Sequence, residues 1–200
     1  MRIISALSTL ILGLSVPATL HSQSTAPKDG FVSHTEVALD YNYVRSSTAP
    51  APTGQTSAFT INGVSATGAY LWRSHISLVA DFSGTHVNGI ENTGRSFTLL
   101  TSTVGGRYTF RSIKRFLPFA QVLAGEAHAM GSVYPSTVAS SGGADSVAII
   151  VGGGVDHPLN HVVSLRLGAA YLYTGLPNVT TSHQSDLRAD GGLVIHFGGR

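Results

Sequence analysis

The stretch VVSLRLGAAYLYT, residues 162–174, alternates between apolar side chains and smaller or polar ones. Successive side chains of a β-strand point to opposite faces, so a period of two predicts a strand with one apolar face. The apolar face carries Val163, Leu165, Leu167, Ala169, Tyr171 and Tyr173, and the opposite face carries Ser164, Arg166, Gly168 and Ala170.

Seven further stretches alternate in the same way, at 36–44, 58–72, 76–86, 97–110, 116–129, 146–157 and 185–197. The facing of 116–129 stays open, because Gln121 shares a face with Phe119 and Leu123, while Val122 shares the other with Glu126 and His128. A shift of one residue would exchange these two faces.

The connections between the stretches alternate in length. Short ones lie near 73–75, 111–115 and 158–161, and long ones near 45–57, 87–95, 131–144 and 175–184. Tight turns at one end and long loops at the other are typical of antiparallel strands in up-and-down order, and eight such strands can close into a barrel. The sequence therefore predicts an all-β fold, an eight-stranded antiparallel up-and-down barrel, over residues 31–200.

The composition excludes several classes of protein. Charged residues are 11% of the 200 residues, against roughly 25% in an ordinary soluble domain. A net charge of +2 and the lack of a basic run with interleaved aromatics argue against nucleic-acid binding. The absence of cysteine excludes thiol catalysis, disulfides and cysteine-based metal centres.

The few charges gather on the polar side of the strands, and this separates two kinds of barrel. A lipocalin-like carrier would turn that side outward, but so few charges would solvate its surface poorly. A membrane barrel would turn it inward, where acids and arginines can pair and where a cost of about 2–4 kcal/mol for an arginine facing lipid is avoided. We therefore predict a transmembrane barrel. The side chains expected inside are Glu36, Asp40, Asp81, Arg107, Glu126, Asp156, Arg166, Asp186, Arg188 and Asp190, whereas Asp29, Glu91 and Asp145 are expected in turns, loops or the N-terminal tail.

Aromatic residues cluster near the ends of the predicted strands, as in the girdles that mark the two interfaces of a membrane barrel. They are Tyr41, Tyr43, Tyr70, Trp72, Tyr108, Phe110, Tyr171, Tyr173 and Phe197.

The N-terminus has the layout of a secretory signal peptide. A positive start at Met1–Arg2 precedes an apolar run from Ile3 to Val16, which is too short for a spanning helix. We expect a signal peptide at 1–22, with cleavage between 22 and 26.

Two patterns suggest a ligand site and are better explained by structure. Gly152-Gly153-Gly154 lacks the ending of a phosphate loop, so we interpret it, like Gly105-Gly106, as close backbone approach or curvature in a barrel strand. His157 and His161 flank a turn containing Pro158, which favours an interfacial turn over a metal site. His86, His128 and His183 are expected near the outer rim or loops. No metal or cofactor is expected.

Four residues could form a lipid-facing serine–histidine–acid site, as a lipid-modifying enzyme requires. They are Ser83 or Ser132 with His86 and Glu126. The His-x-Ser-Asn element of lipid A deacylases is absent, so we predict no catalytic residues.

The chain resembles the small outer-membrane β-barrel domain proteins of OmpA/OmpX type across the segment after the signal peptide. The likeness lies in HISLVADFSGTHV at 75–87, TVGGRYTFRSIKRFLPFAQVLAG at 103–125, IIVGGGVDHPLNHVVSLRLGAAYLYT at 149–174 and DLRADGGLVIHFGGR at 186–200. The last segment is similar to the terminal-strand signal read by the barrel-assembly machinery, with matches at Asp190, Gly192, Ile195 and Phe197. Gly198-Gly199-Arg200 extend past the terminal aromatic where that signal ends.

These observations together predict a non-enzymatic outer-membrane barrel. Its interior would be occluded by paired charges, and it would act structurally or through its outer loops, whose partner the sequence does not identify. The outer-membrane lipid and the barrel-assembly machinery are the expected partners. A lipid A deacylase-like enzyme and a periplasmic lipocalin-like carrier are the alternatives.

Overall fold

The computed structural model describes residues 34–48, 57–88, 96–111, 115–131, 143–176 and 183–198. The predicted signal peptide at 1–22 and its cleavage region lie outside the described residues, as do Ser132 and most of the long connections. Among the residues described, no helix is long and apolar enough to cross a membrane.

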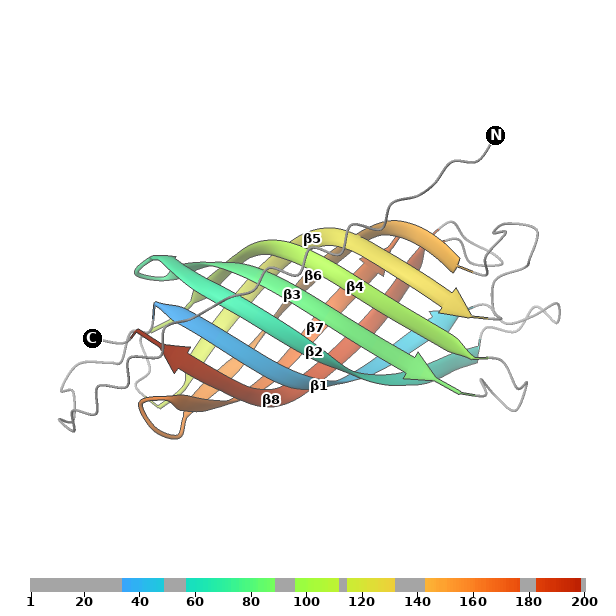
Figure 1. Ribbon diagram of the computed structural model, residues 1–200. Helices are drawn as coiled ribbons and strands as arrows, with labels where there is room; N and C mark the ends of the chain where they lie inside the picture. The colour runs from blue at the N-terminus through green and yellow to red at the C-terminus, as the bar shows by residue number, and fades with distance from the viewer. Residues whose placement is uncertain are drawn as a thin grey trace.

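Eight antiparallel strands follow one another around a closed barrel, each paired with its neighbours in the sequence (Figure 1). Their bounds are β1 (Thr35–Thr48), β2 (Ser57–Arg73), β3 (Ile76–Val87), β4 (Phe97–Thr109), β5 (Leu117–Gly131), β6 (Gly143–Pro158), β7 (Val163–Thr174) and β8 (Gln184–Phe197). All eight predicted stretches are confirmed, and so is the up-and-down order.

The first and last strands close the barrel. β1 and β8 pair in register from Thr35 opposite Phe197 to Ser46 opposite Asp186. Because of this pairing, neither strand has an open edge. An inserted barrel must be closed in this way, because lipid offers no hydrogen-bond partners to an unpaired strand.

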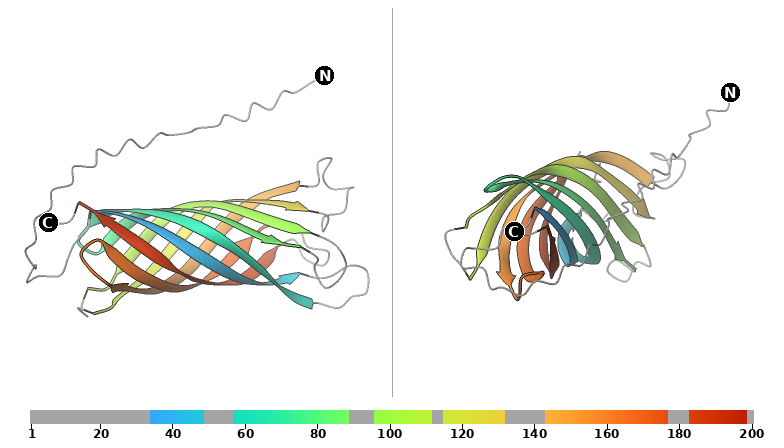
Figure 2. Two further views of the ribbon diagram at one scale, coloured as in Figure 1. Left: turned by 60° about the horizontal axis from the view of Figure 1, so that its bottom comes forward. Right: turned by 60° about the vertical axis from the view of Figure 1, so that its left-hand side comes forward.

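The two ends of the barrel differ, as the three views of Figures 1 and 2 show. At one end, here called the turn end, β1 begins, β8 ends and the short connections at 74–75 and 159–162 join neighbouring strands. At the opposite end, the loop end, the connections 49–56, 88–96, 132–142 and 175–183 join the strands.

Side chains alternate between a buried interior face and an exposed outer face over most of each strand. In β1, for example, Ala38, Asp40 and Asn42 are buried, while Leu39 and Tyr41 are exposed. The outer face is the apolar one, with Leu39, Val64 and Leu167 more than 60% exposed, at 63%, 65% and 63%. The structure thus confirms that the polar faces turn inward.

The strand with the open assignment, β5, turns Phe119, Gln121 and Leu123 inward. Glu126 is therefore exposed on the outer wall, and its expected place in the interior was wrong. This orientation places Gln121 inside, where it accepts a hydrogen bond from Arg107, and Val122 on the apolar outer wall. Glu126 lies toward the loop end of β5, where an outward charge costs less than in the middle of the apolar band.

Asp145 also differs from the prediction. We expected it in a loop or turn, but β6 begins at Gly143 and places Asp145 on the outer wall. Its register partner on β5 is His128. A strand can extend past its apolar pattern here because the neighbouring strand β5 continues to Gly131 and supplies backbone partners.

Candidate functional site: the barrel interior and the outer wall

Nearest the turn end, a network of charges lies in the interior. Arg166 of β7 donates two hydrogen bonds to Asp156 of β6, from Nε to Oδ1 and from Nη2 to Oδ2, each 2.7 Å long. Glu36 of β1 lies 3.5 Å from Arg107 Nη1 and 3.9 Å from Arg166 Nη2. His196 of β8 faces Glu36, with Nδ1 3.6 Å from Oε1. Five strands thus contribute to one cluster in which opposite charges compensate each other's loss of water.

Two arginines of this cluster contact the same aromatic ring. The guanidinium carbons of Arg107 and Arg166 lie 4.6 and 4.9 Å from the centre of the Phe119 ring. Such cation–π contacts stabilise a guanidinium that has lost water. The Nε of Arg107 also donates to Gln121 Oε1 at 3.0 Å.

A glycine on β6 makes room for that ring. A Cβ atom added at Gly154 would lie against the carbonyl oxygen of Leu167 on β7 and 2.8 Å from Cζ of Phe119, closer to both than a Cβ atom approaches its neighbours. Our interpretation of the Gly152–Gly154 run as a place of close approach is therefore confirmed for this residue.

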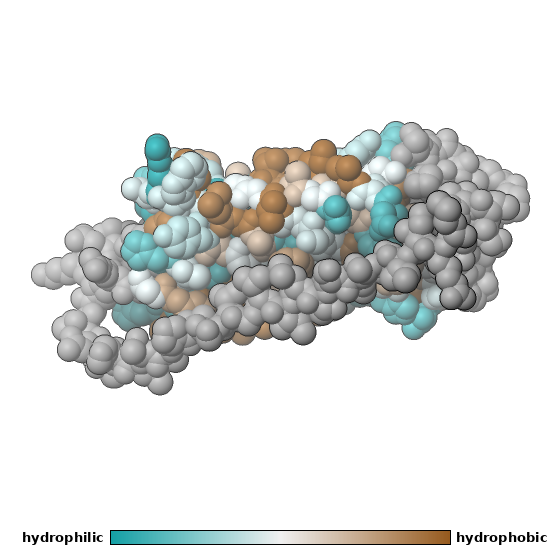
Figure 3. Space-filling model, turned by 45° about the horizontal axis from the view of Figure 1, so that its top comes forward, coloured by the Kyte–Doolittle hydropathy of each residue, from teal (hydrophilic) through white to brown (hydrophobic). Residues whose placement is uncertain are grey.

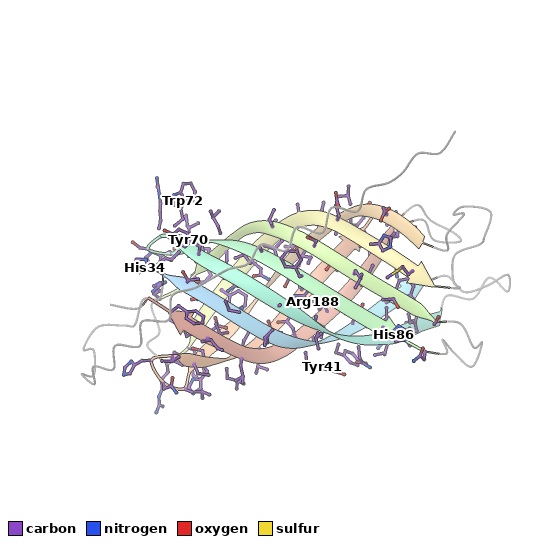
Figure 4. All side chains as sticks on the ribbon, in the orientation of Figure 1. His34, Tyr41, Tyr70, Trp72, His86 and Arg188 are labelled. Atoms are coloured by element: carbon purple, nitrogen blue, oxygen red, sulfur yellow. The ribbon has the colours of Figure 1, made fainter. Side chains whose placement is uncertain are left out.

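A second charge cluster lies midway along the barrel. Arg188 of β8 reaches Asp81 of β3, with its Nη1 and Nη2 atoms 3.3 and 3.5 Å from the two carboxylate oxygens. The Oγ1 of Thr67 donates to Asp81 at 2.9 Å, and Arg188 Nε also contacts Asp190 at 3.4 Å. Figure 4 places Arg188 within the barrel. This pair links two strands that are not neighbours in the sheet.

Toward the loop end the interior contains a large apolar cluster, which sequence reasoning missed, beside the buried polar side chains of Ser46, Thr174, Gln184 and Asp186. Phe59 and Phe97 meet edge to face with their ring centres 6.1 Å apart. The large side chains of this apolar cluster, all at most 7% exposed, are Val44, Phe59, Ile61, Phe97, Leu99, Leu123, Ile150, Leu172 and Leu176. A signal for it existed: in β4 the inward positions Phe97 and Leu99 are as apolar as the outward Leu100, so alternation weakens there.

The outer wall is apolar with aromatic ends. Tyr70 and Trp72 point outward at the turn end (Figure 4) and are 56% and 62% exposed. The space-filling view shows hydrophobic side chains along the middle of one face and hydrophilic ones toward its ends (Figure 3). This arrangement matches the apolar band and aromatic girdles of a barrel that spans a bilayer.

Of the considered serine–histidine–acid residues that the structure describes, Ser83 and His86 lie on opposite faces of β3. Ser83 lies on the inner side of β3 and contacts Thr101 Oγ1 at 2.6 Å, whereas His86 is exposed on the outer side. His86 hydrogen-bonds Thr98 and Asn88 instead, at 2.7 and 2.8 Å.

A different polar group lies on the outer wall near the loop end. His128 Nδ1 is hydrogen-bonded to Asp145 Oδ1, and Glu126 lies on the same face of β5. Across the next pair of strands, Ser102 is the register partner of Glu126. Sequence reasoning missed this group because it depends on the facing of β5 and on the start of β6.

The remaining histidines make local contacts. His157 Nδ1 is 2.9 Å from the carbonyl oxygen of Arg115, and its ring packs on Phe116. His183 stacks on Tyr173 with ring centres 5.6 Å apart. Within the described part of the chain, no three His, Asp or Glu side chains are arranged to hold a metal ion.

Comparisons with known proteins support the fold alone. No protein-family model matches the chain, and no curated protein matches it. Solved structures do match. Neisserial surface protein A superposes with a TM-score of 0.62 at 15% identity, covering 84% of this chain and all 100% of that one.

Two further solved structures share the architecture. OprG, an outer membrane protein of Pseudomonas aeruginosa, has a TM-score of 0.54 at 12% identity and covers 84% of this chain and 97% of its own. Ail, the attachment invasion locus protein of Yersinia pestis, was solved in complex with the heparin analogue sucrose octasulfate; it has a TM-score of 0.51 at 16% identity, over 82% of this chain and 99% of its own. With its closed eight-stranded meander and apolar outer wall, the chain has the fold of the small β-barrels of the bacterial outer membrane.

Proposed function

We propose that this chain is a non-enzymatic outer-membrane barrel with an occluded interior, acting structurally or through surface interactions of its outer loops. The observation that carries the proposal is the content of the interior. Charged clusters around Arg166 and Arg188 occupy the turn end and the middle, and the apolar cluster lies toward the loop end together with buried polar side chains such as Gln184 and Asp186. An eight-stranded barrel is only just wide enough for side chains to fill.

The charged clusters and the apolar cluster would block different solutes. Buried ion pairs hold their side chains in place, since separating them leaves an uncompensated charge in a region poor in water. A cluster of large apolar side chains excludes ions because it offers them no ligands. A solute that passed one kind of cluster would still meet the other.

Planar-bilayer recording tests occlusion. The purified, folded protein should give no steady openings of nanosiemens size, while a wide porin added to the same bilayers provides the positive control. Steady openings of that size would contradict an occluded interior.

Surface interaction is the second part of the proposal. Long loops of outer-membrane barrels face the exterior, and loops carry binding functions more often than the scaffold that holds them. Ail, a barrel of the same fold, has been crystallised with a heparin analogue, which supports surface binding as a role that this fold can have. We also propose that the barrel-assembly machinery reads β8, where Phe197 is the last strand residue.

A lipid-modifying enzyme remains the second candidate, because one observation favours it. The hydrogen bond from His128 Nδ1 to Asp145 is the kind that orients an imidazole as a general base. Mass spectrometry of lipid A from cells with and without the protein separates the two functions. We expect lipid A to have the same acyl composition in both. If cells with the protein lose an acyl chain from lipid A, and cells with the His128→Ala variant keep it, the enzyme would replace our proposal.

A further inference from the structure

A groove of about 850 Å³ crosses the outer wall from β1 to β6. Its lining alternates: outward side chains such as Leu39, Phe82 and Leu100 form its walls, and the inward residues Asp40, Ser65, Ser83, Thr101 and Ala127 lie between them on the same strands. Its volume falls in the range of sites that bind small molecules. In an inserted barrel it would face the bilayer.

The floor of the groove consists of short side chains on three neighbouring strands. Ala66 of β2, Gly84 of β3 and Ser102 of β4 form this floor. Larger outward side chains rise beside them, including Phe82, 58% exposed, and Leu100, 42% exposed. Small residues between large ones leave a channel with apolar walls, which suits a flexible hydrocarbon chain.

The groove lies closer to the loop end at each strand that it crosses from β1 to β6. It begins beside Leu39, in the half of β1 nearer the turn end, and reaches Asp145, close to the start of β6 at the loop end. Strands of a barrel are tilted against its axis, so a row of paired residues changes depth as it runs around the wall. One end of the groove therefore lies deep in the apolar band, and the other lies near the outer interface.

The shallow end is the polar one. Glu126 and the hydrogen-bonded pair of His128 and Asp145 line it, and the side chains of His128 and Asp145 are 46% and 85% exposed. Among the described residues that line the groove there is no lysine or arginine. The two carboxylates thus make this end acidic, and it complements a cation or a group with several N–H donors.

We propose that the groove binds one lipid of the outer leaflet that carries an ammonium headgroup. Its acyl chain lies along Ala66, Gly84 and Ser102, and its ammonium group contacts Glu126 and Asp145. The charge pattern selects against a lipid whose headgroup is anionic only. This site lies outside the interior, so it does not depend on whether the barrel is occluded.

Native mass spectrometry tests the proposal with defined lipids. The folded protein is transferred from nanodiscs that contain equal amounts of phosphatidylethanolamine and phosphatidylglycerol with identical acyl chains. We expect one bound phosphatidylethanolamine per barrel, favoured over phosphatidylglycerol by about fivefold, as two exposed charge contacts would give.

Two changes separate the roles of chain and headgroup. Ala66→Phe fills the floor and should abolish the bound lipid. Its matched control is Ala189→Phe, because Ala189 lies outward on β8 in a smaller groove that Arg45 lines. The pair Glu126→Gln and Asp145→Asn keeps the shape and should reduce the preference between the lipids to about onefold.

Folding of each variant is checked by heat-modifiable gel migration. If Ala66→Phe does not fold, the test relies on the isosteric double variant, Glu126→Gln with Asp145→Asn. The proposal is overturned if the original protein binds no lipid, if it binds both lipids equally, or if Ala66→Phe retains the lipid. A dimer in place of the lipid adduct would assign the groove to a second copy of the chain and would also overturn it.

Discussion

Arg188 and Asp81 form an ion pair across the barrel, joining β8 to β3, with Nη1 of the arginine 3.3 Å from a carboxylate oxygen. The side chains are 5% and 1% exposed. Strands β8 and β3 share no backbone pairing, so this contact ties together opposite parts of the wall through the interior.

Removal of one partner of this pair should destabilise the barrel strongly. Arg188→Ala leaves Asp81 buried without its cation, at a cost of about 3–5 kcal/mol. The Arg188→Met, Asp81→Leu double variant removes both charges and should be less destabilised than Arg188→Ala. Urea titration in micelles, followed by the mobility difference between folded and unfolded protein, measures both. Equal stability of Arg188→Ala and the original protein would contradict the pair's role.

Two glycines that differ in their surroundings provide a matched test of interior packing. Gly154→Ala would press a methyl group against the carbonyl oxygen of Leu167 and against Phe119, and we expect a loss of about 1–3 kcal/mol. Gly106→Ala is the control, because a Cβ atom there meets nothing within 4 Å. The same urea titration compares them. A tolerated Gly154→Ala would mean that Phe119 and the backbone of β7 at Leu167 can move to accept the methyl group.

The cost of placing an arginine on the apolar outer wall should depend on its depth in the bilayer. Leu167, 63% exposed in β7, lies within the apolar band, so Leu167→Arg should cost about 2–4 kcal/mol. Val162, 52% exposed in the turn before β7, should lose at most about 1 kcal/mol when changed to arginine. Unfolding from lipid vesicles gives the two values. A similar cost at both positions would argue against a bilayer around this wall.

Replacing Phe197 should impair barrel assembly more than replacing another exposed aromatic residue of the outer wall does. We expect Phe197→Ala to lower the fraction of heat-modifiable barrel in the outer membrane, because the terminal aromatic is part of the proposed assembly signal. Phe110→Ala is the control, since Phe110 is comparably exposed, at 49% against 43%, but lies after β4. Equal losses in the two variants would assign Phe197 to the girdle alone.

Most of the fold could be predicted from period-two alternation, and the reason is visible in β7. Leu165 and Leu167 face out and Ser164 and Arg166 face in, as residues 162–174 predict. Where both faces carry mixed side chains, as in 116–129, alternation does not specify the register, and Glu126 was misplaced. The polar group of Glu126, His128 and Asp145 could not be predicted for the same reason.

The sequence by itself determined the number of strands, their order and which solvent the outer wall faces, because each of these follows from local alternation and from the lengths of the connections. The tertiary structure decided which residues meet across the barrel. Arg188 with Asp81, Phe119 with Arg107 and Arg166, and the groove that ends at Asp145 all join residues far apart in the chain. Their contacts depend on the stagger and tilt of the closed sheet, and no single strand carries that information.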